Sequence, residues 1–513
     1  MSENLIRVRF APSPTGGLHL GGVRTALFNY LFAKKHGGKF ILRIEDTDQG
    51  RFVEGAEKYI IDCLNWCGIS PDEGPHKAGN YGPYRQSERK ESYRKHAENL
   101  IAQGFAYYAF DTPEELEAMR DEFKSAENPS PQYNGMIRGK MKNSITLSPE
   151  EVKTLLDNKT PYVIRIKMPA SREIVLQDMI RGEVIFNTDQ VDDKVLLKAD
   201  GMPTYHLAVV VDDHEMKISH AFRGEEWLPS APVHVLLWEY LGWKNEMPEW
   251  AHFPLILKPD GKGKLSKRDG DRLGFPVFAM DWTDPKTEET AKGFKEMGFL
   301  PEAFVNMLAL LGWNDGTEEE IFDLQSLCER FSIDRIHKGG AKFDFEKAKW
   351  FNAEWIKKSS TEHLLPMVKK VLKENNIDAA EQKIATLIPM VKERCHLLTD
   401  FYHHTVYFFN DPEKIDTDAL LPKWDEAKTT FFNDWQKDIA EISAWTTETL
   451  EASFKKATTE KQIKPGELQL PMRIMLVGGK FGPPVFEIAM LIGKEATIRR
   501  IKNGLSFIKN VPQ

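Results

Sequence analysis

The chain has 513 residues, of which 41% are hydrophobic and 28% charged, and its formal net charge is −8. At roughly 150 residues per domain, this length predicts three to four domains, and the composition excludes disordered and fibrous classes. No window approaches the ~18 uncharged apolar residues of a membrane helix, so no membrane association is expected. Four cysteines are too few for a disulfide framework, which predicts a cytoplasmic protein.

The N-terminal third alternates strand and helix patterns. Residues 6–10 and 39–44 are predicted strands, and residues 25–35 and 54–66 have helical periodicity. A Pro/Gly turn separates the first strand from the first helix. This order is that of a parallel α/β unit, and such sheets bind ligands at the carboxyl ends of their strands.

The rest of the chain divides into an insertion, a return to the sheet and a helical rear half. Scattered short strands and charged helices over residues 106–190 predict an insertion. Further strands are expected at 195–199, 207–211 and 253–257, and a helix at 228–241. Beyond about residue 301 the period is helical, with helices expected at 303–311, 362–373, 384–401 and 425–435. The predicted fold is an α/β half, with a parallel sheet split by an α+β insertion, followed by an all-α half.

The most informative segment, FAPSPTGGLHLGG at residues 10–22, lies between the first strand and the first helix. Its glycines allow close backbone approach, and the helix N-terminus that follows suits an anion. His19 can donate a hydrogen bond to a phosphate oxygen. The spacing matches neither G-x-G-x-x-G nor the Walker A pattern, and the glycines alone are equally typical of a tight turn.

A second segment, KPDGKGKLSKRDGD at residues 258–271, is a glycine-containing cationic loop. Five cations fall within 11 residues: Lys258, Lys262, Lys264, Lys267 and Arg268. A flexible cationic loop can close over a polyphosphate and stabilise developing charge, although a solvated surface loop has the same composition.

Together the two segments resemble the signatures of class I aminoacyl-tRNA synthetases. The HIGH-like residues are Pro12, Ser13, Pro14, Thr15, Gly16, Gly17, Leu18, His19, Leu20, Gly21 and Gly22, and the KMSKS-like residues are Lys264, Leu265, Ser266, Lys267 and Arg268. Their separation of about 240 residues, across an insertion, suits the split catalytic domain of that class. Longer segments, among them RIEDTD, GPYRQSER and RGEEWLPSAPVHVLLWEYLGW, resemble bacterial glutamyl-tRNA synthetases, and the resemblance runs from Arg7 to about Ile501.

This resemblance implies a domain order. It comprises a Rossmann-like catalytic domain (1–105 and 191–260), an insertion that binds the acceptor stem (106–190), a KMSKS-loop and stem-contact domain (261–340), and two helical anticodon-binding subdomains (341–410 and 411–513). Eukaryotic-type and glutamine enzymes of the subclass carry β-barrels in the rear half, and the helical periodicity argues against them.

The implied activity is that of a glutamate–tRNA ligase, which forms glutamyl adenylate from ATP and L-glutamate and transfers the glutamyl group to tRNA(Glu). ATP with Mg²⁺ and tRNA(Glu) are the expected partners, and the family suggests a monomer. Two alternatives are a paralogue that glutamylates a modified tRNA base, which would lack the helical rear half, and a catalytically inactive RNA-binding relative. Charging of tRNA(Gln) in addition stays open.

By this resemblance, the residues that bind glutamate in the family correspond to Arg9, Ala11, Ser13, Glu45, Tyr205 and Arg223 in this chain. A substrate with two carboxylates and one ammonium group requires cations in a fork geometry, which arginine provides, and an acidic partner, here Glu45. The resemblance assigns ATP to His19, Gly21, Glu226, Lys264 and Lys267, with His19 and Lys267 as catalytic residues. Each residue taken alone also fits an ordinary ion pair or a core position.

The sequence departs from the family at two places. Gly22 stands where the HIGH signature ends in histidine, and the second signature reads KLSKR. Some members bind zinc through a Cys-x-Cys pair near the start of the insertion, but here that place is Tyr-Ala-Phe-Asp at 108–111, so no metal site and no zinc are expected. Cys63 and Cys67, one helical turn apart, are expected to be buried thiols.

The rear half carries two candidate tRNA contacts. Lys392 and Arg394 fall where the family reads the third anticodon base, although an exposed helix face explains them equally well. Residues 464–513 contain eight Lys or Arg against three Glu, which predicts a basic face for tRNA phosphates or a merely solvated surface.

Overall fold

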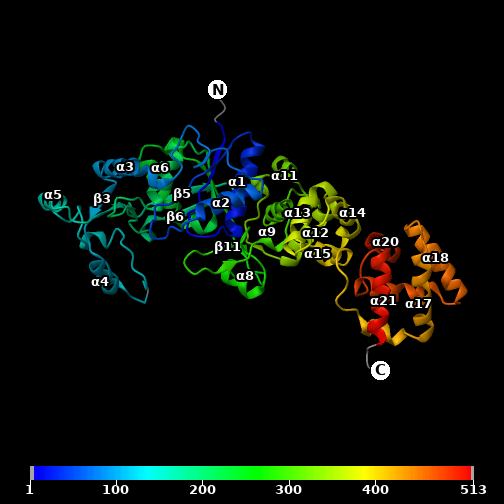
Figure 1. Ribbon diagram of the computed structural model, residues 1–513. Coiled ribbons are helices and arrows are strands. Elements are labelled where there is room, and N and C mark those ends of the chain that lie inside the picture. The colour runs from blue at the N-terminus through cyan, green and yellow to red at the C-terminus, as the bar shows by residue number, and fades with distance from the viewer. Residues whose placement is uncertain (1–4, 127, 510–513) are drawn as a thin grey trace. The chain divides into compact units, whose positions relative to one another are not determined.

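The computed structural model describes residues 5–126 and 128–509, apart from the side chains of Lys267, Asp271 and Lys423. The chain folds into two compact units, each described by itself (Figure 1). The first unit comprises Met1–Glu296 and Pro301–Phe351, and the second comprises Met297–Leu300 and Asn352–Gln513.

A six-stranded sheet in the order β2-β1-β8-β9-β5-β6 organises the first unit. Its strands are β1 (Arg7–Phe10), β2 (Lys39–Leu42), β5 (Glu173–Asp178), β6 (Gly182–Asn187), β8 (His220–Gly224) and β9 (Glu249–Phe253). Neighbours from β2 to β5 pair in parallel, and only the β5–β6 hairpin is antiparallel. All residues of β1 are buried, as expected for a parallel strand that is covered on both faces.

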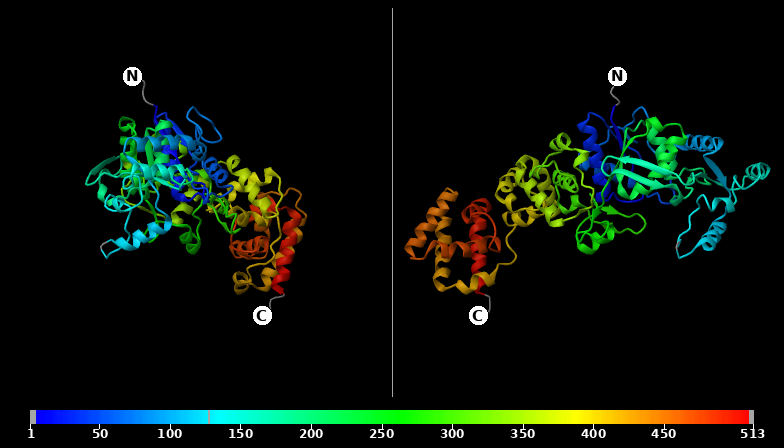
Figure 2. Two further views of the ribbon diagram at one scale, coloured as in Figure 1. Left: turned by 90° about the vertical axis from the view of Figure 1, so that its left-hand side faces the viewer. Right: turned by 180° about the vertical axis from the view of Figure 1, so that it is seen from behind.

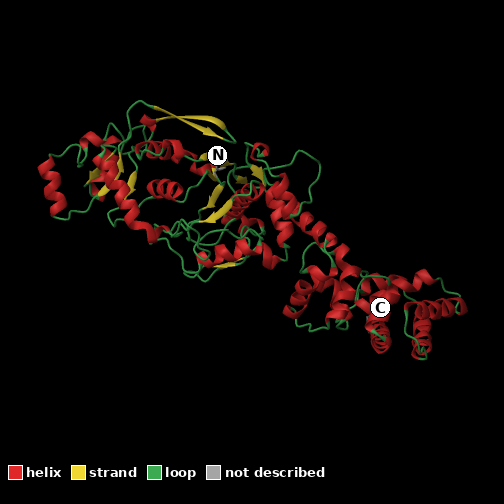
Figure 3. Cartoon of the chain, turned by 90° about the horizontal axis from the view of Figure 1, so that it is seen from above, coloured by secondary structure: helices red, strands yellow, loops and turns green. Residues whose placement is uncertain are grey.

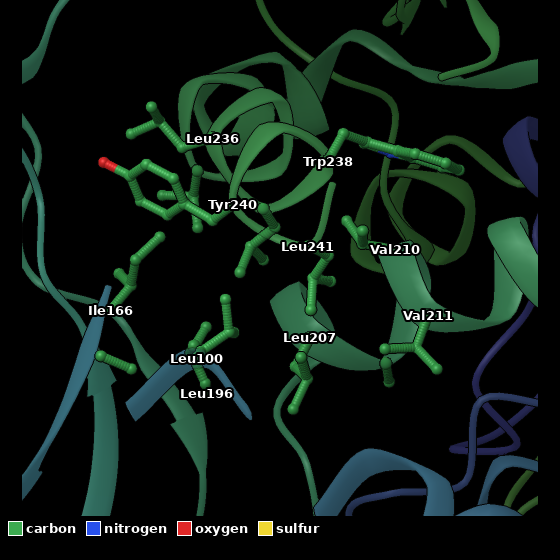
Figure 4. Close-up of a cluster of buried hydrophobic side chains, with 14 of the residues drawn as sticks. Leu100, Ile166, Leu196, Leu207, Val210, Val211, Leu236, Trp238, Tyr240 and Leu241 are labelled. Atoms are coloured by element: carbon green, nitrogen blue, oxygen red, sulfur yellow. The ribbon is translucent and has the colours of Figure 1, made fainter. Parts of the chain in front are cut away.

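Helices cover this sheet. They are α1 (Leu20–Lys35), α2 (Ala56–Trp66), α3 (Lys90–Ala102), α6 (Tyr205–Glu215) and α7 (Ala231–Tyr240). Helix α1 packs on β1, β2 and β8, with α10 (Pro301–Leu310) and α11 (Leu324–Arg330) beside it. A buried cluster drawn from α3, α6, α7 and nearby strands includes Leu100, Leu207, Leu236 and Trp238 (Figure 4).

A smaller antiparallel sheet, β3-β4-β7, lies outside the main one. Its strands are β3 (Ala106–Ala109), β4 (Val163–Ile166) and β7 (Val195–Leu197), and the intervening chain forms α4 (Pro113–Phe123) and α5 (Pro149–Asp157). The strand pairing does not follow the boundaries expected for the insertion, residues 106–190. Strands β5 and β6 lie within 106–190 but extend the main sheet, whereas β7 lies beyond residue 190 but belongs to the small sheet.

The first unit ends in short strands and helices. They are β10 (Ile256–Leu257), α8 (Lys267–Leu273), β11 (Trp282–Thr283), β12 (Thr290–Ala291), α9 (Phe294–Met297), β13 (Ala341–Lys342) and the start of α12 (Phe345–Lys358). Strands β10 and β13 pair in parallel on either side of this region.

The described part of the second unit contains helices and loops without a strand (Figure 3). Its helices after α12 are α13 (Thr361–Glu374), α14 (Glu381–Val391), α15 (Asp400–Thr405), α16 (Thr417–Leu420), α17 (Glu426–Ala440), α18 (Thr447–Glu460), α19 (Pro465–Val477), α20 (Val485–Ile492) and α21 (Lys494–Lys509). Helices α17, α18 and α19 pack with α21 and α20 around Phe432, Trp435 and Met472 (Figure 2). Among the described residues, no helix combines the length and apolar character required to span a bilayer.

The predicted α/β half and helical half are confirmed, but individual elements need correction. The apolar run 207–211, expected as a strand, belongs to helix α6. Helix α6 is buried over most of its circumference. Residues 207–211 therefore lack the amphipathic period that distinguishes a helix from a buried strand. The strand expected at 253–257 is interrupted by Pro254, which has no N–H for a ladder, and Phe253 instead ends β9.

The helix expected over 384–401 is broken. Helix α14 ends at Val391, and α15 begins only at Asp400. The Asp400 carboxylate accepts hydrogen bonds from the backbone N–H groups of His396 (2.8 Å) and Leu397 (2.9 Å). Side-chain acceptors of this kind compete with helical hydrogen bonds, so they explain the break.

Candidate active site

Three neighbouring strands and one helix meet at a single crevice in the first unit. From β1 the chain passes through α1 to β2 on one side, while β8 lies on the other side of β1. A crevice at the carboxyl ends of strands where the order reverses is the usual ligand site of such sheets. A cavity of about 230 Å³ opens here, and its lining includes all six residues predicted for glutamate: Arg9, Ala11, Ser13, Glu45, Tyr205 and Arg223.

Arg223, on β8, is the most unusual charge in this cavity. Its side chain is buried, and its partners are all uncharged acceptors. Nε donates to His252 Nε2 (2.8 Å), and Nη1 donates to the Tyr205 hydroxyl (2.9 Å) and to His234 Nδ1 (3.1 Å). Nη2 is buried with no hydrogen-bond partner among the described residues. A buried cation that keeps a free pair of donors in a cavity is suited to bind an anion.

Arg9, on β1, is held differently, because a carboxylate neutralises it. Its Nε and Nη2 donate to the two oxygens of Asp213 (3.0 and 3.1 Å), and Nη1 donates to the Phe222 carbonyl (3.1 Å). This bidentate pair fixes the plane of the guanidinium. One edge of the Arg9 guanidinium is therefore held in a fixed orientation at the cavity. The net charge at Arg9 is smaller than that at Arg223.

Glu45, just beyond β2, supplies the negative group of the cavity. One carboxylate oxygen accepts a hydrogen bond from Arg43 Nη2 (3.1 Å). Burial raises the pKa of Glu45 to about 6, although Arg43 and Arg9 partly offset this effect. A cationic ligand group beside Glu45 would restore its ionised form.

A second cavity of about 310 Å³ lies next to the N-terminus of α1. Its lining includes four residues predicted for ATP: His19, Gly21, Glu226 and Lys264. At Gly21 an added Cβ would meet only the His19 ring at 3.9 Å, so the backbone leaves open space here for a ligand to approach the N-terminus of α1. Lys264 Nζ donates to Glu226 (2.7 Å), which joins the cationic loop to the segment after β8.

His19 is the N-cap of α1 and is held in one tautomer. Its Nδ1 accepts a hydrogen bond from the Gly21 N–H (3.3 Å), so the proton of the neutral ring is on Nε2. Nε2 is buried without a partner among the described residues. Burial, with a contribution from Lys264, lowers the pKa of His19 to about 4, so the ring is a neutral donor at neutral pH.

The first signature segment contacts the chain that follows the second one. The Leu20 N–H donates to the Val277 carbonyl (2.9 Å), shortly after α8. A Cβ at Gly17 would approach Trp282 within 2.7 Å and Phe278 within 2.9 Å, so only glycine allows this packing. Leu265 is buried beside the second cavity, whereas Arg268 is exposed. The predicted catalytic side chain of Lys267 lies outside the described residues.

A third cavity of about 230 Å³ was not anticipated from the sequence. It shares Ser13, Glu45, Tyr205 and Trp227 with the first cavity and extends to Asp46 and Lys198. The sequence also gave no role to Asp213, His234 and His252, which hold the two arginines. No local motif marks these residues, since each reaches the site from a different element.

The cysteines and potential metal ligands lie apart from these cavities. Cys63 and Cys67 are buried free thiols on and just after α2, as predicted, and burial raises the pKa of both. Among the described residues, no group of three or more His, Cys, Asp or Glu side chains is arranged to hold a metal ion. The absence of zinc stays a prediction.

In the second unit, Lys392 and Arg394 have different environments. Lys392 Nζ donates to the carbonyls of Lys357 (2.8 Å) and Ser359 (3.0 Å) at the end of α12. Arg394 is exposed, donates only to the Met390 carbonyl (3.2 Å) among the described atoms, and lines a cavity of about 570 Å³ together with Arg473. Lys392 does not line that cavity. The structure thus separates the two residues that the sequence grouped together.

Much of the basic charge in 464–513 also has partners inside the unit. Arg473 donates to the carbonyls of residues 481–483, and Lys494 donates to the Ile442 carbonyl. Arg499 and Arg500 both pair with Asp411. Lys464 and Lys502 are exposed, and no ion pair involves them within the described chain. The basic face predicted from charge is therefore narrower than the sequence indicates.

Comparisons with known proteins identify the family of this chain. Residues 5–350 match the family of class I tRNA synthetases (E and Q), catalytic domain, and residues 359–505 match an anticodon binding domain. A glutamate–tRNA ligase of Christiangramia forsetii is 51% identical over 98% of this chain and 99% of its own length. A crystal structure of a glutamate tRNA ligase from Elizabethkingia meningosepticum, in complex with its amino acid, is 49% identical with a TM-score of 0.93, covering 98% of this chain and 99% of that one.

A second solved structure, the glutamate–tRNA synthetase of Elizabethkingia anophelis, is 49% identical with a TM-score of 0.89 and covers 98% of this chain and 100% of that one. The catalytic-domain match alone spans well over half of the sequence. This chain therefore belongs to the class I tRNA synthetases of the glutamate and glutamine group.

Proposed function

We propose that this chain is a glutamate–tRNA ligase, which activates L-glutamate with ATP and transfers it to the 3′-terminal adenosine of tRNA(Glu). Full-length relatives at about half identity support this reaction. The observation that carries the proposal is Arg223, a buried cation with an unpartnered Nη2 that lines one cavity with Arg9 and Glu45. Two guanidinium groups and one carboxylate complement the two carboxylates and one ammonium group of glutamate.

Within this proposal, Arg9 and Arg223 bind the carboxylates, and Glu45 binds the ammonium group. Tyr205 forms a wall of the pocket, and its hydroxyl already accepts a hydrogen bond from Arg223. Ser13 and Ala11 line the same cavity and supply hydroxyl and backbone contacts. Because Arg223 has no carboxylate partner among the described residues, the substrate itself provides the missing counter-charge.

ATP occupies the adjoining cavity at the N-terminus of α1. The open space at Gly21 lets phosphate oxygens approach the positive end of the helix dipole, and the unpartnered Nε2–H of His19 is a donor for them. Lys264 lines this cavity from the cationic loop, Lys267 of the same loop is the second cation expected to contact phosphate, and Glu226 orients the ribose or a phosphate-bound water. Mg²⁺ accompanies ATP and is held mainly by phosphate oxygens and water.

The chemistry needs positioning rather than a protein nucleophile. The α-carboxylate of glutamate attacks the α-phosphate of ATP, and diphosphate leaves. Since the substrate supplies the nucleophile, catalysis rests on alignment and on stabilisation of the developing negative charge by His19 and Lys267.

The third cavity and the second unit serve tRNA in this proposal. The third cavity adjoins the glutamate pocket through Ser13, Glu45 and Tyr205, so it is suited to the 3′ end of the tRNA. Arg394, exposed beside Arg473, is the candidate reader of the anticodon. The match to an anticodon binding domain argues against a short paralogue that modifies a tRNA base. We also propose a cytoplasmic monomer.

ATP–diphosphate exchange, measured with L-glutamate and tRNA present, tests the proposal. Exchange that requires glutamate, followed by charging of purified tRNA(Glu), is expected. Parallel charging of tRNA(Gln) measures how selective the second unit is. Binding of tRNA without glutamate-dependent exchange would identify the chain as an inactive RNA-binding relative.

A further inference from the structure

Three adjacent strands of the main sheet place three polar side chains in a row. Asp178 ends β5, His252 lies in β9 and Arg223 lies in β8. The parallel register pairs Arg223 directly with His252, and Asp178 with Trp250. The row therefore ends at the cavity that we assign to glutamate.

The hydrogen bonds of this row determine which ring nitrogen of His252 carries the proton. Nδ1 lies 2.6 Å from Asp178 Oδ2, and Nε2 lies 2.8 Å from Arg223 Nε. A guanidinium group can only donate, so Nε2 must be the acceptor and the ring proton must be on Nδ1, facing Asp178. Burial lowers the pKa of His252, which agrees with a neutral ring.

Asp178 is itself locked in place. Its Oδ1 accepts hydrogen bonds from the backbone N–H groups of Ile180 and Arg181 (both 3.0 Å), which leaves Oδ2 for His252. Burial alone would raise the pKa of Asp178, but these hydrogen bonds keep it below its ordinary value. The side chains of Asp178 and His252 are both fully shielded from solvent.

We propose that Asp178 and His252 are positioning residues for Arg223: they orient its guanidinium through a neutral imidazole, while Nη2 has no hydrogen-bond partner and the guanidinium forms no ion pair among the described residues. This inference rests on the proposed binding of glutamate. In this arrangement a neutral side chain orients the guanidinium of Arg223, so its positive charge is not neutralised. Arg9 differs, because Asp213 both orients its guanidinium and neutralises its charge. A direct Asp–Arg223 contact would reduce the charge available to the substrate carboxylate.

The test uses Asp178→Asn, which changes polarity with almost no change in shape. The two backbone N–H groups keep the asparagine oxygen on their side, so the amide NH₂ faces His252 Nδ1. His252 must then accept at Nδ1 and carry its proton on Nε2, where it confronts the Arg223 Nε–H. An Asp→Asn change that selects the wrong histidine tautomer while preserving geometry is known from the serine protease triad.

In the full-length protein, with tRNA present, Asp178→Asn is expected to raise the KM for L-glutamate in ATP–diphosphate exchange by about 10- to 100-fold, the usual range for a disturbed contact to a charged group. The KM for ATP should stay within about twofold, since the row does not reach the ATP cavity. Asp193→Asn is the matched control, because Asp193 is equally buried and accepts from Tyr107 and the Met168 N–H, but it pairs with Arg138 and contacts neither His252 nor Arg223. It should leave the KM for glutamate unchanged, even if its melting temperature falls.

His252 provides a second, independent pair of variants. In His252→Gln, one amide can accept from Arg223 and donate to Asp178, so the KM for glutamate should remain near the wild-type value. His252→Leu fills similar space without hydrogen bonds and should raise that KM as Asp178→Asn does. The proposal is overturned if the Gln and Leu variants behave alike, if the KM for ATP rises with that for glutamate, or if a folded Asp178→Asn protein binds glutamate normally. A wild-type protein without glutamate-dependent exchange would instead refute the proposed function.

Discussion

The glutamate pocket and the helical second unit use arginine in opposite ways. In the pocket, Arg223 contacts only neutral acceptors and keeps Nη2 without a partner in the described structure. In the second unit, Arg500 donates to three backbone carbonyls and to Asp411, so its charge and its donors are already satisfied. Both side chains are buried, and both belong to segments that the sequence singled out.

The difference shows that the type and position of a residue identify it as a candidate for ligand binding. Whether it can bind a ligand depends on whether its hydrogen-bond donors already have partners in the protein. A guanidinium with free, oriented donors can bind a ligand anion, and one that is saturated by carbonyls holds loops and helix ends together. The variants below test this distinction, starting with the largest expected effect.

Replacing each of the two arginines by alanine should separate binding from stability. Arg223→Ala is expected to weaken glutamate binding by about 2–5 kcal/mol, because a charge-assisted contact is lost and the carboxylate remains unpaired. ATP binding should persist. Arg500→Ala should lower the melting temperature of the protein and leave glutamate binding intact. Calorimetric titration and thermal unfolding measure the two effects, and equal loss of ATP and glutamate in Arg223→Ala would make Arg223 structural.

The cationic loop is expected to act on the transition state. Lys267→Ala should lower the rate of adenylate formation by about 10²–10³-fold, the usual cost of one preorganised contact to developing charge. Affinity for glutamate should change little. Lys262→Ala, in the same exposed loop, is the control and should retain the rate. A Lys267 variant that loses glutamate binding but keeps diphosphate exchange would contradict the assignment.

Local sequence patterns predicted a ligand site at the carboxyl ends of the first strands, and they singled out His19 beside the first helix. The family resemblance assigned the individual residues Arg9, Glu45, Tyr205 and Arg223, which line one cavity in the structure. The fold class followed from the same alternation of strand and helix, and it is confirmed by the parallel sheet.

What the sequence could not provide was the pairing between distant segments. Asp178 was assigned to the insertion because no local signal shows that β5 returns to the main sheet beside β9. The run that contains Val209 and Val210 was read as a strand, because a fully buried helix has no amphipathic period. The family resemblance grouped Lys392 with Arg394 as anticodon contacts, although the ammonium group of Lys392 is bound to carbonyls at the end of α12.

Arg394 and Lys392 provide the same kind of contrast within the second unit. Arg394→Gln is expected to shift the preference between tRNA(Glu) and tRNA(Gln) by about 1–3 kcal/mol, the range for one base contact. Lys392→Ala should not change that preference, but should destabilise the unit by about 1.5–3 kcal/mol because two carbonyls lose a charged donor. Charging kinetics with both tRNAs measure the first effect and thermal unfolding the second. If Arg394→Gln weakens both tRNAs equally, Arg394 contacts phosphate and another residue reads the anticodon.

Glu45 should make glutamate binding depend on pH. Its pKa of about 6 in the free protein means that it becomes protonated as the pH falls below 6, and the protonated form cannot pair with the substrate ammonium group. The carboxylates of the substrate remain mostly ionised above pH 5, so the affinity should be about tenfold lower at pH 5 than at pH 7. Glu45→Gln should bind more weakly at pH 7 and show a nearly flat profile. A wild-type profile that is equally flat would remove Glu45 from the ammonium site.

The smallest effects are expected at the exposed lysines of the C-terminal segment. Lys464 and Lys502 are exposed, unlike Arg500 in the same segment, so they can approach tRNA phosphates but not select a base. Lys464→Gln and Lys502→Gln should each weaken tRNA(Glu) and tRNA(Gln) to the same extent, by a few-fold, and reduce the slope of log affinity against log salt concentration by about one. Lys370→Gln, on the exposed face of α13 and paired with Glu374, serves as a control of equal charge. If that control changes the slope as much as the two C-terminal lysines do, the effect reflects net charge alone, and the segment makes no defined contact with tRNA.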